Sequence, residues 1–216
     1  TIKGVWIRLD APIRFQAGQY VNLNLPGGIG SRAFSLASPP SASGEVELNI
    51  RSVPGGQGTA YVHEKLQVGE RIGISGPYGR FFVKKSAQVP VLFMAGGSGL
   101  SSPRSMILDL LEEGSTLPIT LVYGARNQGE LYYHQEFLDL AAQYPNFTYV
   151  PALNDEPADS GWTQTLERIA QSVVAIQVDQ TRAFDTEWNN SSQATGFVVD
   201  AERGLVLTNR HVVTPG

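Results

Sequence analysis

The stretch that most constrains the fold is residues 90–114, PVLFMAGGSGLSSPRSMILDLLEEG. It opens with an apolar run at 91–95, which has the length of a buried strand and is too short for a membrane span. A glycine-rich turn follows, then Pro103, which suits the first turn of a helix, and apolar residues at helical spacing as far as Gly114. This order predicts a phosphate cradle, because glycines let the backbone approach a ligand and a helix N-terminus offers unpaired N–H groups.

Two further strands extend this unit. Residues 118–124 and 146–153 have the composition of buried strands, and residues 132–144 have the pattern of an amphipathic helix between them. A β-α-β-α-β series predicts a parallel sheet with right-handed crossovers. The middle of the chain is therefore expected to be an α/β nucleotide-binding domain.

The chain before this unit, residues 1–85, is expected to be an all-β module. Residues 4–10, 19–25 and 45–51 alternate between apolar and polar side chains, and Gly- and Pro-rich turns separate them. Short strands at close spacing predict a small antiparallel β-barrel. Residues 59–66 predict a short helix with Thr59 as its cap, whose hydroxyl and nearby N–H groups could meet a phosphate.

Composition excludes several classes of site. A net charge of −4 and a pI near 5.4 argue against a nucleic-acid surface. With no cysteine, the chain cannot form a disulfide, a zinc–thiolate site or a cysteine-ligated iron–sulfur cluster, and we expect no metal site. No transmembrane segment or signal peptide is visible, so a cytoplasmic protein is the default expectation. Because the sequence begins with Thr1 rather than Met, we expect it to be cut from a longer chain.

A tetrapeptide in the β module, Arg32-Ala33-Phe34-Ser35, offers a cation, an aromatic ring and a hydroxyl close together. A flavin dinucleotide needs such a set: charge for the pyrophosphate, a flat face for the ring and a donor near its reactive nitrogen. The alternative interpretation is a surface arginine beside a core phenylalanine, and the tetrapeptide alone does not decide between them.

Six pieces of the chain follow one family's motifs in order and spacing: AGQY at 17–20, RAFS at 32–35, ELNIR at 47–51, GPYGRFF at 76–82, MAGGSGLSSPRSMI at 94–107 and LVYGARNQGELYYHQEF at 121–137. Through them, residues 1–159 resemble the reductase component of phenol hydroxylase and related bacterial multicomponent monooxygenases, in the ferredoxin–NADP reductase superfamily. The resemblance implies FAD in the barrel and hydride transfer to it from NADH or NADPH. Electrons would then pass singly to an iron–sulfur ferredoxin module or an oxygenase component, and a cysteine-ligated cluster would lie outside a chain without cysteine.

The resemblance also implies roles for individual residues. In the family's RxYS-type motif, Arg32 would pair with the pyrophosphate, Phe34 would contact the isoalloxazine in place of the commoner Tyr, and Ser35 would hydrogen-bond near flavin N5. Ile50 and Arg51 would line the flavin tail, with Gly58 and Thr59 on the pyrophosphate. The nicotinamide dinucleotide would take Gly96, Gly97, Ser98, Gly99, Leu100 and Ser101.

Arg126 follows the second strand of the α/β unit, where the adenosine ribose of a dinucleotide would lie. An acidic residue there would favour NADH, whereas an arginine can accept the 2′-phosphate of NADPH. A solvent-facing arginine is an equal alternative, so the sequence leaves NADH and NADPH both open.

The character of the chain changes at residues 154–161, a turn-rich and acidic stretch suited to a domain boundary. Beyond it, residues 162–171 predict a helix, and residues 172–178, 194–200 and 204–208 predict strands. The reductase superfamily has further strands in its nucleotide-binding sheet and a Cys-Gly-Pro-type motif near its C-terminus. The tail shows no match to these strands or to this motif.

The tail instead resembles the HtrA/DegP-type trypsin-like serine proteases, through SVVAIQV at 172–178 and SSQATGFVVDAERGLVLTNRHVV at 191–213. The TNRHVV motif would make His211 the catalytic base, but the aspartate and serine of that family would follow the last residue printed. We therefore expect His211 to be inactive in this chain.

The predicted organisation has three parts. Residues 1–85 are expected to form an FAD-binding β-barrel without its first strand, residues 86–159 a truncated NAD(P)-binding α/β domain, and residues 160–216 a partial trypsin-like barrel. The first interpretation of function is a flavin oxidoreductase. The alternatives are an HtrA-type endopeptidase fragment and a catalytically inert fusion.

Overall fold

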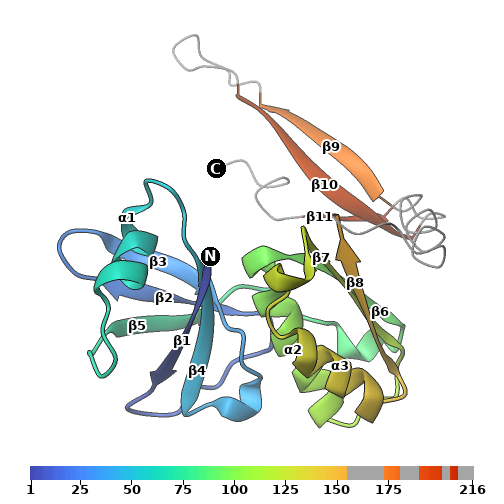
Figure 1. The fold of residues 1–216 in the computed structure, drawn as a ribbon. Helices are drawn as coiled ribbons and strands as arrows, with labels where there is room; N and C mark the ends of the chain where they lie inside the picture. Colours follow the sequence, from blue (N-terminus) through green and yellow to red (C-terminus); the bar gives the residue numbers. More distant parts are fainter. Residues whose placement is uncertain (155–172, 181–189, 201–204, 209–216) are drawn as a thin grey trace. The chain divides into compact units, whose positions relative to one another are not determined.

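The structure is a computed structural model that describes residues 1–154, 173–180, 190–200 and 205–208. The chain divides into two compact units, Thr1–Glu156 and Pro157–Gly216, which are described separately below (Figure 1). No helix within the described ranges is long and apolar enough to cross a bilayer.

The first unit begins with two antiparallel sheets. One pairs the first and fourth strands, and the other places β2 between β3 and β5. A bridge between Leu36 and Leu48 connects the segment after β3 to β4. The strands are β1 (Ile2–Arg8), β2 (Tyr20–Leu25), β3 (Gly30–Ser35), β4 (Glu45–Arg51) and β5 (Gly73–Tyr78).

Alternation explains why these sheets close over a core. In β2, Val21, Leu23 and Leu25 are buried while Asn22 and Asn24 point away from the core. The antiparallel β module and the strand predicted at 45–51 are confirmed. The sequence missed β3 and β5 as strands, because β3 begins with Gly30 and β5 contains two glycines and a proline.

The helix of this antiparallel β module, whose residues 1–85 are called the barrel from here on although their strands form two sheets, is α1 (Gln57–Ala60). It continues as one turn of π-helix, Tyr61–Lys65. The prediction that Thr59 caps this helix is wrong, because the N-cap is Gly56 and Thr59 lies inside the first turn. The Thr59 hydroxyl instead accepts the Val53 N–H at 3.1 Å and so closes the loop that precedes the helix.

The second half of the first unit is a parallel sheet in the order β6-β7-β8, as predicted. Its elements are β6 (Val91–Gly96), α2 (Ser101–Glu112), β7 (Ile119–Ala125), α3 (His134–Gln143) and β8 (Phe147–Leu153). Figure 1 shows α2 and α3 together beside this sheet, and their apolar faces share one core with it. Short 3-10 turns lie at Pro40–Ala42, Lys85–Ala87, Gly97–Leu100 and Gln128–Glu130.

The second unit contains an antiparallel sheet in the order β11-β10-β9. Its strands are β9 (Val173–Gln180), β10 (Asn190–Asp200) and β11 (Leu205–Thr208), so strands occur where the sequence predicts them. The helix predicted at 162–171 and the predicted base His211 lie outside the described residues.

Candidate flavin and nucleotide sites

The predicted flavin tetrapeptide forms the end of β3, next to the central strand β2. Because directly opposed residues of an antiparallel pair share a face, Arg32 and Phe34 lie on the side of Leu23 and Val21. Ser35 lies on the other side, opposite Tyr20. The hydroxyl therefore points to a different face of the strand from the cation and the ring.

Arg32 lies over the first turn of α1. A Cβ atom added at Gly58 would come within 2.9 Å of Arg32 Cγ and 3.2 Å of Leu25 Cδ1. Gly58 is buried, whereas Arg32 is exposed and its Nη1 donates to the Ser31 carbonyl at 2.8 Å. The fold thus brings Arg32 next to Gly58 and its neighbour Thr59, as a pyrophosphate contact requires, although Arg32 is more than twenty residues before them in the sequence.

The two predicted flavin-tail residues differ in exposure. The Ile50 side chain is buried in the barrel core, and its carbonyl oxygen is 2.9 Å from His63 Nε2. Arg51, at the end of β4, is exposed. Of these two side chains, only that of Arg51 reaches the surface.

The glycine turn joins β6 to α2. Gly96 ends the strand, Gly97–Leu100 forms a 3-10 turn, and Ser101 begins the helix. Gly97 has a φ of +52°, a conformation that favours glycine. No side chain caps the N-terminus of α2, which continues directly from the 3-10 turn, so that the Ser101 N–H donates to the Ser98 carbonyl.

Gly99 is an exposed residue of the turn. Its φ lies outside the left-handed region, and a Cβ atom added there would meet nothing within 4 Å. Neither backbone conformation nor packing within the described chain calls for glycine at this position. The pyrophosphate contact that the sequence predicts for Gly99 stays a prediction.

The other residues of the turn make internal contacts. Leu100 is buried in the core, and the Ser101 hydroxyl donates to the Ser98 carbonyl at 2.9 Å. The Tyr132 hydroxyl donates to the Gly97 carbonyl at 2.6 Å, and burial raises the pKa of that phenol. One hydrogen bond within the turn and one from Tyr132 outside it therefore hold its shape.

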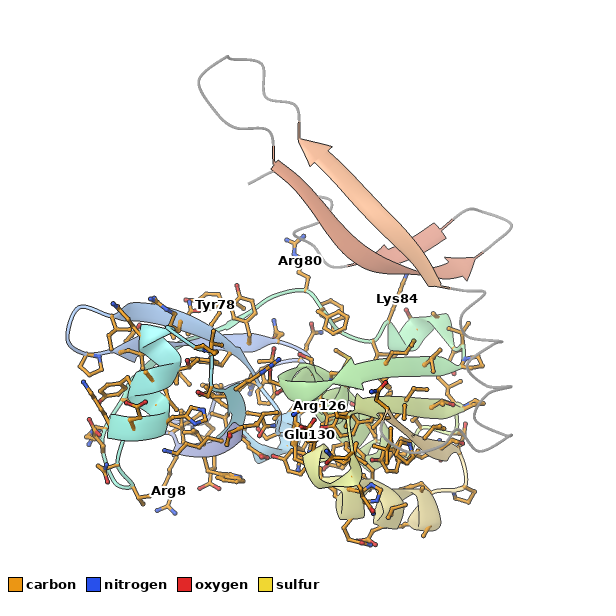
Figure 2. All side chains as sticks on the ribbon, turned by 45° about the horizontal axis from the view of Figure 1, so that its top comes forward. Arg8, Tyr78, Arg80, Lys84, Arg126 and Glu130 are labelled. Carbon is orange, nitrogen blue, oxygen red and sulfur yellow. The ribbon has the colours of Figure 1, made fainter. Side chains whose placement is uncertain are left out.

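Arg126 lies at the carboxyl end of the parallel sheet, just after β7 (Figure 2). Its guanidinium forms an ion pair with Glu130, and the hydrogen bond from Arg126 lowers the pKa of that carboxyl. Both side chains are on the surface. The arginine predicted to meet a 2′-phosphate is thus held beside a carboxylate.

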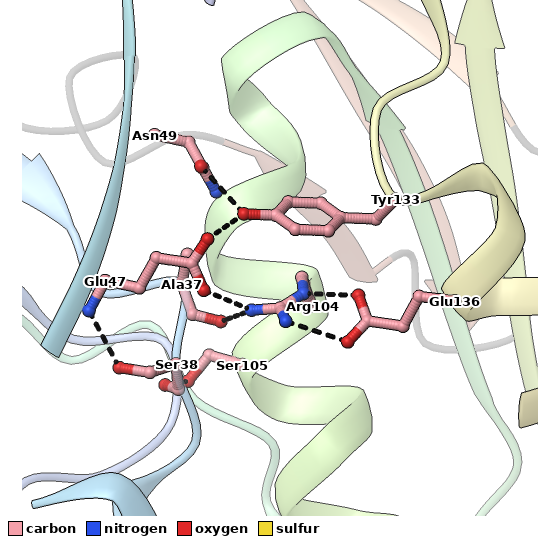
Figure 3. A network of polar contacts seen from close by, with 8 residues as sticks. All are labelled: Ala37, Ser38, Glu47, Asn49, Arg104, Ser105, Tyr133 and Glu136. Atoms are coloured by element: carbon pink, nitrogen blue, oxygen red, sulfur yellow. Dashed lines mark hydrogen bonds and ion pairs between the residues drawn. The ribbon is translucent and has the colours of Figure 1, made fainter. Parts of the chain in front are cut away.

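A buried network that the sequence did not reveal joins the barrel to α2 and α3 (Figure 3). Its centre is Arg104, whose Nη1 donates to Glu47 Oε2 at 2.9 Å and to the Ala37 carbonyl at 2.8 Å. Arg104 Nε and Nη2 donate to the two carboxylate oxygens of Glu136 at 2.7 and 2.8 Å. The side chains of Arg104 and Glu47 are only 10% and 6% exposed, so this ion pair lies in the interior.

Tyr133 completes the network. Its ring centroid is 4.1 Å from Arg104 Cζ, and its hydroxyl donates to Glu47. The pKa of Glu47 is raised, because burial penalises its charge and Glu136 repels it, and Arg104 only partly offsets these effects. The same hydroxyl lies 3.0 Å from the Asn49 side-chain amide.

Within the described residues, no group of His, Asp or Glu side chains is arranged to hold a metal ion. The two candidate places for nucleotides remain those predicted from the sequence: the barrel surface around Arg32 and Gly58, and the turn at the start of α2.

Both the antiparallel β part and the parallel α/β part of the chain match known protein families. Residues 7–83 match the oxidoreductase FAD-binding domain family, and residues 93–190 match the oxidoreductase NAD-binding domain family. Over 162 residues, the chain is 60% identical to the reductase component DmpP of phenol 2-monooxygenase from Pseudomonas sp. (strain CF600). It is 56% identical over 163 residues to the phenol hydroxylase P5 protein of Acinetobacter pittii (strain PHEA-2).

The matched region covers 75% and 76% of this chain but 46% of each of these relatives, so the chain spans about half their length. Among solved structures, the cytochrome P450 reductase GcoB of Amycolatopsis aligns with a TM-score of 0.70 and 30% identity, over 78% of this chain and 54% of the other. The NAD-binding match ends at residue 190 and so runs past the boundary that the sequence predicts after residue 159.

Proposed function

We propose, from its homology to the reductase components of phenol hydroxylases, that residues 1–159 act as an NAD(P)H-dependent flavin oxidoreductase. The barrel would bind FAD, and the turn at the start of α2 would bind NADH or NADPH. When bound, FAD accepts a hydride from the nicotinamide and can release electrons one at a time. The role of the chain is to bind, orient and separate the two cofactors.

The barrel residues divide this work. Arg32, held over Gly58, would pair with the pyrophosphate, assisted by the first N–H groups of α1. Phe34 would contact the flat flavin ring, and Ser35 would donate to its N5 from the opposite face of β3. Arg51 would reach the flavin tail through its exposed side chain, and Ile50 only through its backbone.

The observation that carries the nucleotide half of the proposal is the open space around Gly99. The positive dipole end of α2 lies beside it. The pairing of Arg126 with Glu130 supports NADH, because the carboxylate competes with a 2′-phosphate for the guanidinium and would repel it.

For the electron acceptor, we propose an iron–sulfur ferredoxin module or the oxygenase component of a phenol-type monooxygenase. The support is the printed names of relatives: one is the reductase component of phenol 2-monooxygenase, and another, 35% identical over 160 residues, is the ferredoxin–NAD(P)+ reductase component of the naphthalene 1,2-dioxygenase system of Pseudomonas putida.

Steady-state turnover with an artificial acceptor tests the proposal. The chain loaded with FAD should reduce ferricyanide with NADH as donor, with a kcat/KM at least about tenfold higher for NADH than for NADPH. Turnover with neither donor would contradict the reductase proposal, and a preference for NADPH would contradict only the assignment from Arg126.

A second candidate function concerns residues 160–216, which we propose to be the opening part of an HtrA-type protease barrel. The supporting observation is that β9 pairs antiparallel with β10, whereas the strands of the nucleotide half pair in parallel. This favours the protease resemblance over the NAD-binding match for residues 173–180.

We expect this segment to be inactive, because a serine-protease base needs a nucleophile and an orienting carboxylate. A fluorophosphonate probe should not label the chain, and His211→Ala should not change that result. Stoichiometric labelling that disappears in His211→Ala would show that the chain assembles a working triad.

A further inference from the structure

The buried network around Arg104 connects the two cofactor sites through a single side chain. Arg104 lies in the first turn of α2, three residues after Ser101 at the end of the glycine turn. The carbonyl that it binds belongs to Ala37, two residues after Ser35 at the end of β3. One guanidinium therefore holds both the segment that leaves the predicted flavin contacts and the helix that begins at the predicted nicotinamide contacts.

Further bonds make this connection rigid. The Ser105 hydroxyl donates to the Ser38 carbonyl at 2.7 Å, and the Ser38 hydroxyl accepts the Glu47 N–H at 3.1 Å. Helix α2 is thus attached to the loop after β3 at two successive residues, Arg104 and Ser105. Every nitrogen of the guanidinium has an oxygen partner within 3 Å, so the side chain has little freedom to shift.

Adjacent tyrosines extend the network to the turn itself. Tyr133 lies on the Arg104 guanidinium and donates to Glu47 in the barrel, while Tyr132 donates to the Gly97 carbonyl in the turn. Their ring centroids are 5.1 Å apart. A displacement at Glu47 would therefore reach Gly97 through neighbouring residues as well as through α2.

Burying these charged groups costs free energy, so we expect the geometry that they fix to have a purpose. Removing two carboxylates and a guanidinium from water carries a desolvation penalty that apolar residues of similar size would avoid. The raised pKa of Glu47 reflects that penalty. In exchange, the orientation of the Arg104 guanidinium is fixed, since its planar group can bind two carboxylates and a carbonyl in only one way.

We infer that Arg104 is a positioning residue for hydride transfer, which sets the glycine turn of α2 at a fixed distance and angle from the flavin-binding end of β3. This inference rests on the proposed reductase function. It assigns to Arg104 no contact with either cofactor: the effect passes through Ala37 on one side and Ser101 on the other.

The test is a rapid-mixing measurement of flavin reduction by NADH, without oxygen, on the full chain and on Arg104→Lys. Lysine keeps the charge but cannot bind both carboxylates and the carbonyl in one plane. The limiting rate of reduction at saturating NADH should fall roughly 10- to 100-fold, the effect expected of a displacement near 1 Å. The dissociation constants for FAD and NADH should change by less than about threefold, because the contacts themselves remain. Arg8→Lys, an exposed arginine of β1, is the matched control and should keep the wild-type rate.

A distance measurement separates this inference from the proposed function. Because the chain has no cysteine, the double variant Lys65→Cys (in the barrel) and Gln143→Cys (in α3) carries thiols for spin labels at these two exposed positions and nowhere else. The inter-label distance distribution should be narrow in the otherwise wild-type chain and broader with Arg104→Lys. This readout needs no cofactor, and therefore stands even if the chain proves not to be a reductase.

Should Arg104→Lys fail to fold, Tyr133→Phe replaces it, since this change removes only the hydroxyl that bonds to Glu47 and Asn49 and keeps the ring over Arg104. It should slow reduction by roughly 3- to 10-fold, the loss of one hydrogen bond to a charged group. An unchanged rate together with an unchanged distance distribution would overturn the inference. A rate loss explained entirely by weaker NADH or FAD binding would also overturn it.

Discussion

Gly58 and Gly99 are both expected to lie against a pyrophosphate, yet the protein treats them differently. At Gly58, a Cβ atom would come within 2.9 Å of Arg32 Cγ, so a side chain there would have to displace the stem of Arg32. At Gly99 a Cβ atom would meet nothing within 4 Å. The comparison teaches that packing of the chain against itself limits the space at Gly58, whereas the fold gives no reason for glycine at position 99 and the expected dinucleotide would supply one.

The largest expected effect is that of Gly99→Val. The new side chain would enter space that the protein leaves open, so the fold should be kept and the melting temperature should change by less than about 2 °C. Flavin reduction by NADH should fall at least about 100-fold, because the branched side chain occupies the place of the pyrophosphate. Bound FAD should remain, which flavin absorbance after gel filtration would show. Reduction at the wild-type rate would mean that the turn at 96–101 has only a structural role.

Arg32→Ala tests the flavin cradle around Gly58. A charge-assisted contact to phosphate contributes on the order of 1.5–3 kcal/mol, so FAD affinity should weaken roughly 10- to 150-fold. Titration with FAD, followed by flavin fluorescence, measures this change. The exposed Arg8 supplies the control variant Arg8→Ala, which should bind FAD as the wild type does. Equal affinities for wild type and Arg32→Ala would remove this residue from the flavin site.

Gly58→Ala should have a smaller effect of the same kind. The added methyl would press on the stem of Arg32 and move its guanidinium by a few tenths of an ångström, which we expect to weaken FAD binding by roughly 3- to 10-fold. The effect should vanish when Gly58→Ala is combined with Arg32→Ala, because the displaced side chain is then absent. Additive losses in the double variant would show that Gly58 acts independently of Arg32.

The smallest effect expected is a pH dependence carried by Glu47, which faces Arg104, Glu136 and Tyr133. Its pKa is raised in the folded protein, so the native state binds a proton more tightly than the unfolded chain does. The free energy of unfolding should therefore increase as the pH falls through the raised pKa towards the unfolded value, by no more than about 1.4 kcal/mol per pH unit. Urea unfolding of the wild type and Glu47→Gln at several pH values tests this. The stability of Glu47→Gln relative to wild type should fall as the pH is lowered over this window, and a constant difference would contradict the assignment.

The local pattern of apolar residues, glycines and prolines was enough to predict most of the helices and strands. The strand at 45–51 has the predicted bounds, and the β6–turn–α2 unit lies where its apolar run, glycines and Pro103 place it. The two strands flanking β2 were missed because glycine and proline interrupt the alternation on which a strand prediction depends. The cap assigned to Thr59 was wrong because Gly56 ends the preceding turn and the helix begins earlier.

The network around Arg104 lay beyond local prediction. Alternation in β4 puts Glu47 on the solvent side, yet its side chain is 6% exposed because α2 and Tyr133 cover that face. Its partner Arg104 is 57 residues away, and neither residue breaks the periodicity of its own element. A buried ion pair between the β module and the α/β part depends on how these two parts pack together. The sequence pattern of β4 or of α2 alone carries no information about that packing.

The most direct test of the account is to mix the full chain, loaded with FAD and freed of unbound flavin, with NADH in the absence of oxygen. The account predicts about one FAD per chain and complete loss of its visible absorbance band in wild type. It also predicts a retained, unbleached flavin in Gly99→Val. A chain that holds no flavin, or a Gly99→Val variant that bleaches as fast as wild type, would contradict the claim that the barrel and the glycine turn form two separate cofactor sites.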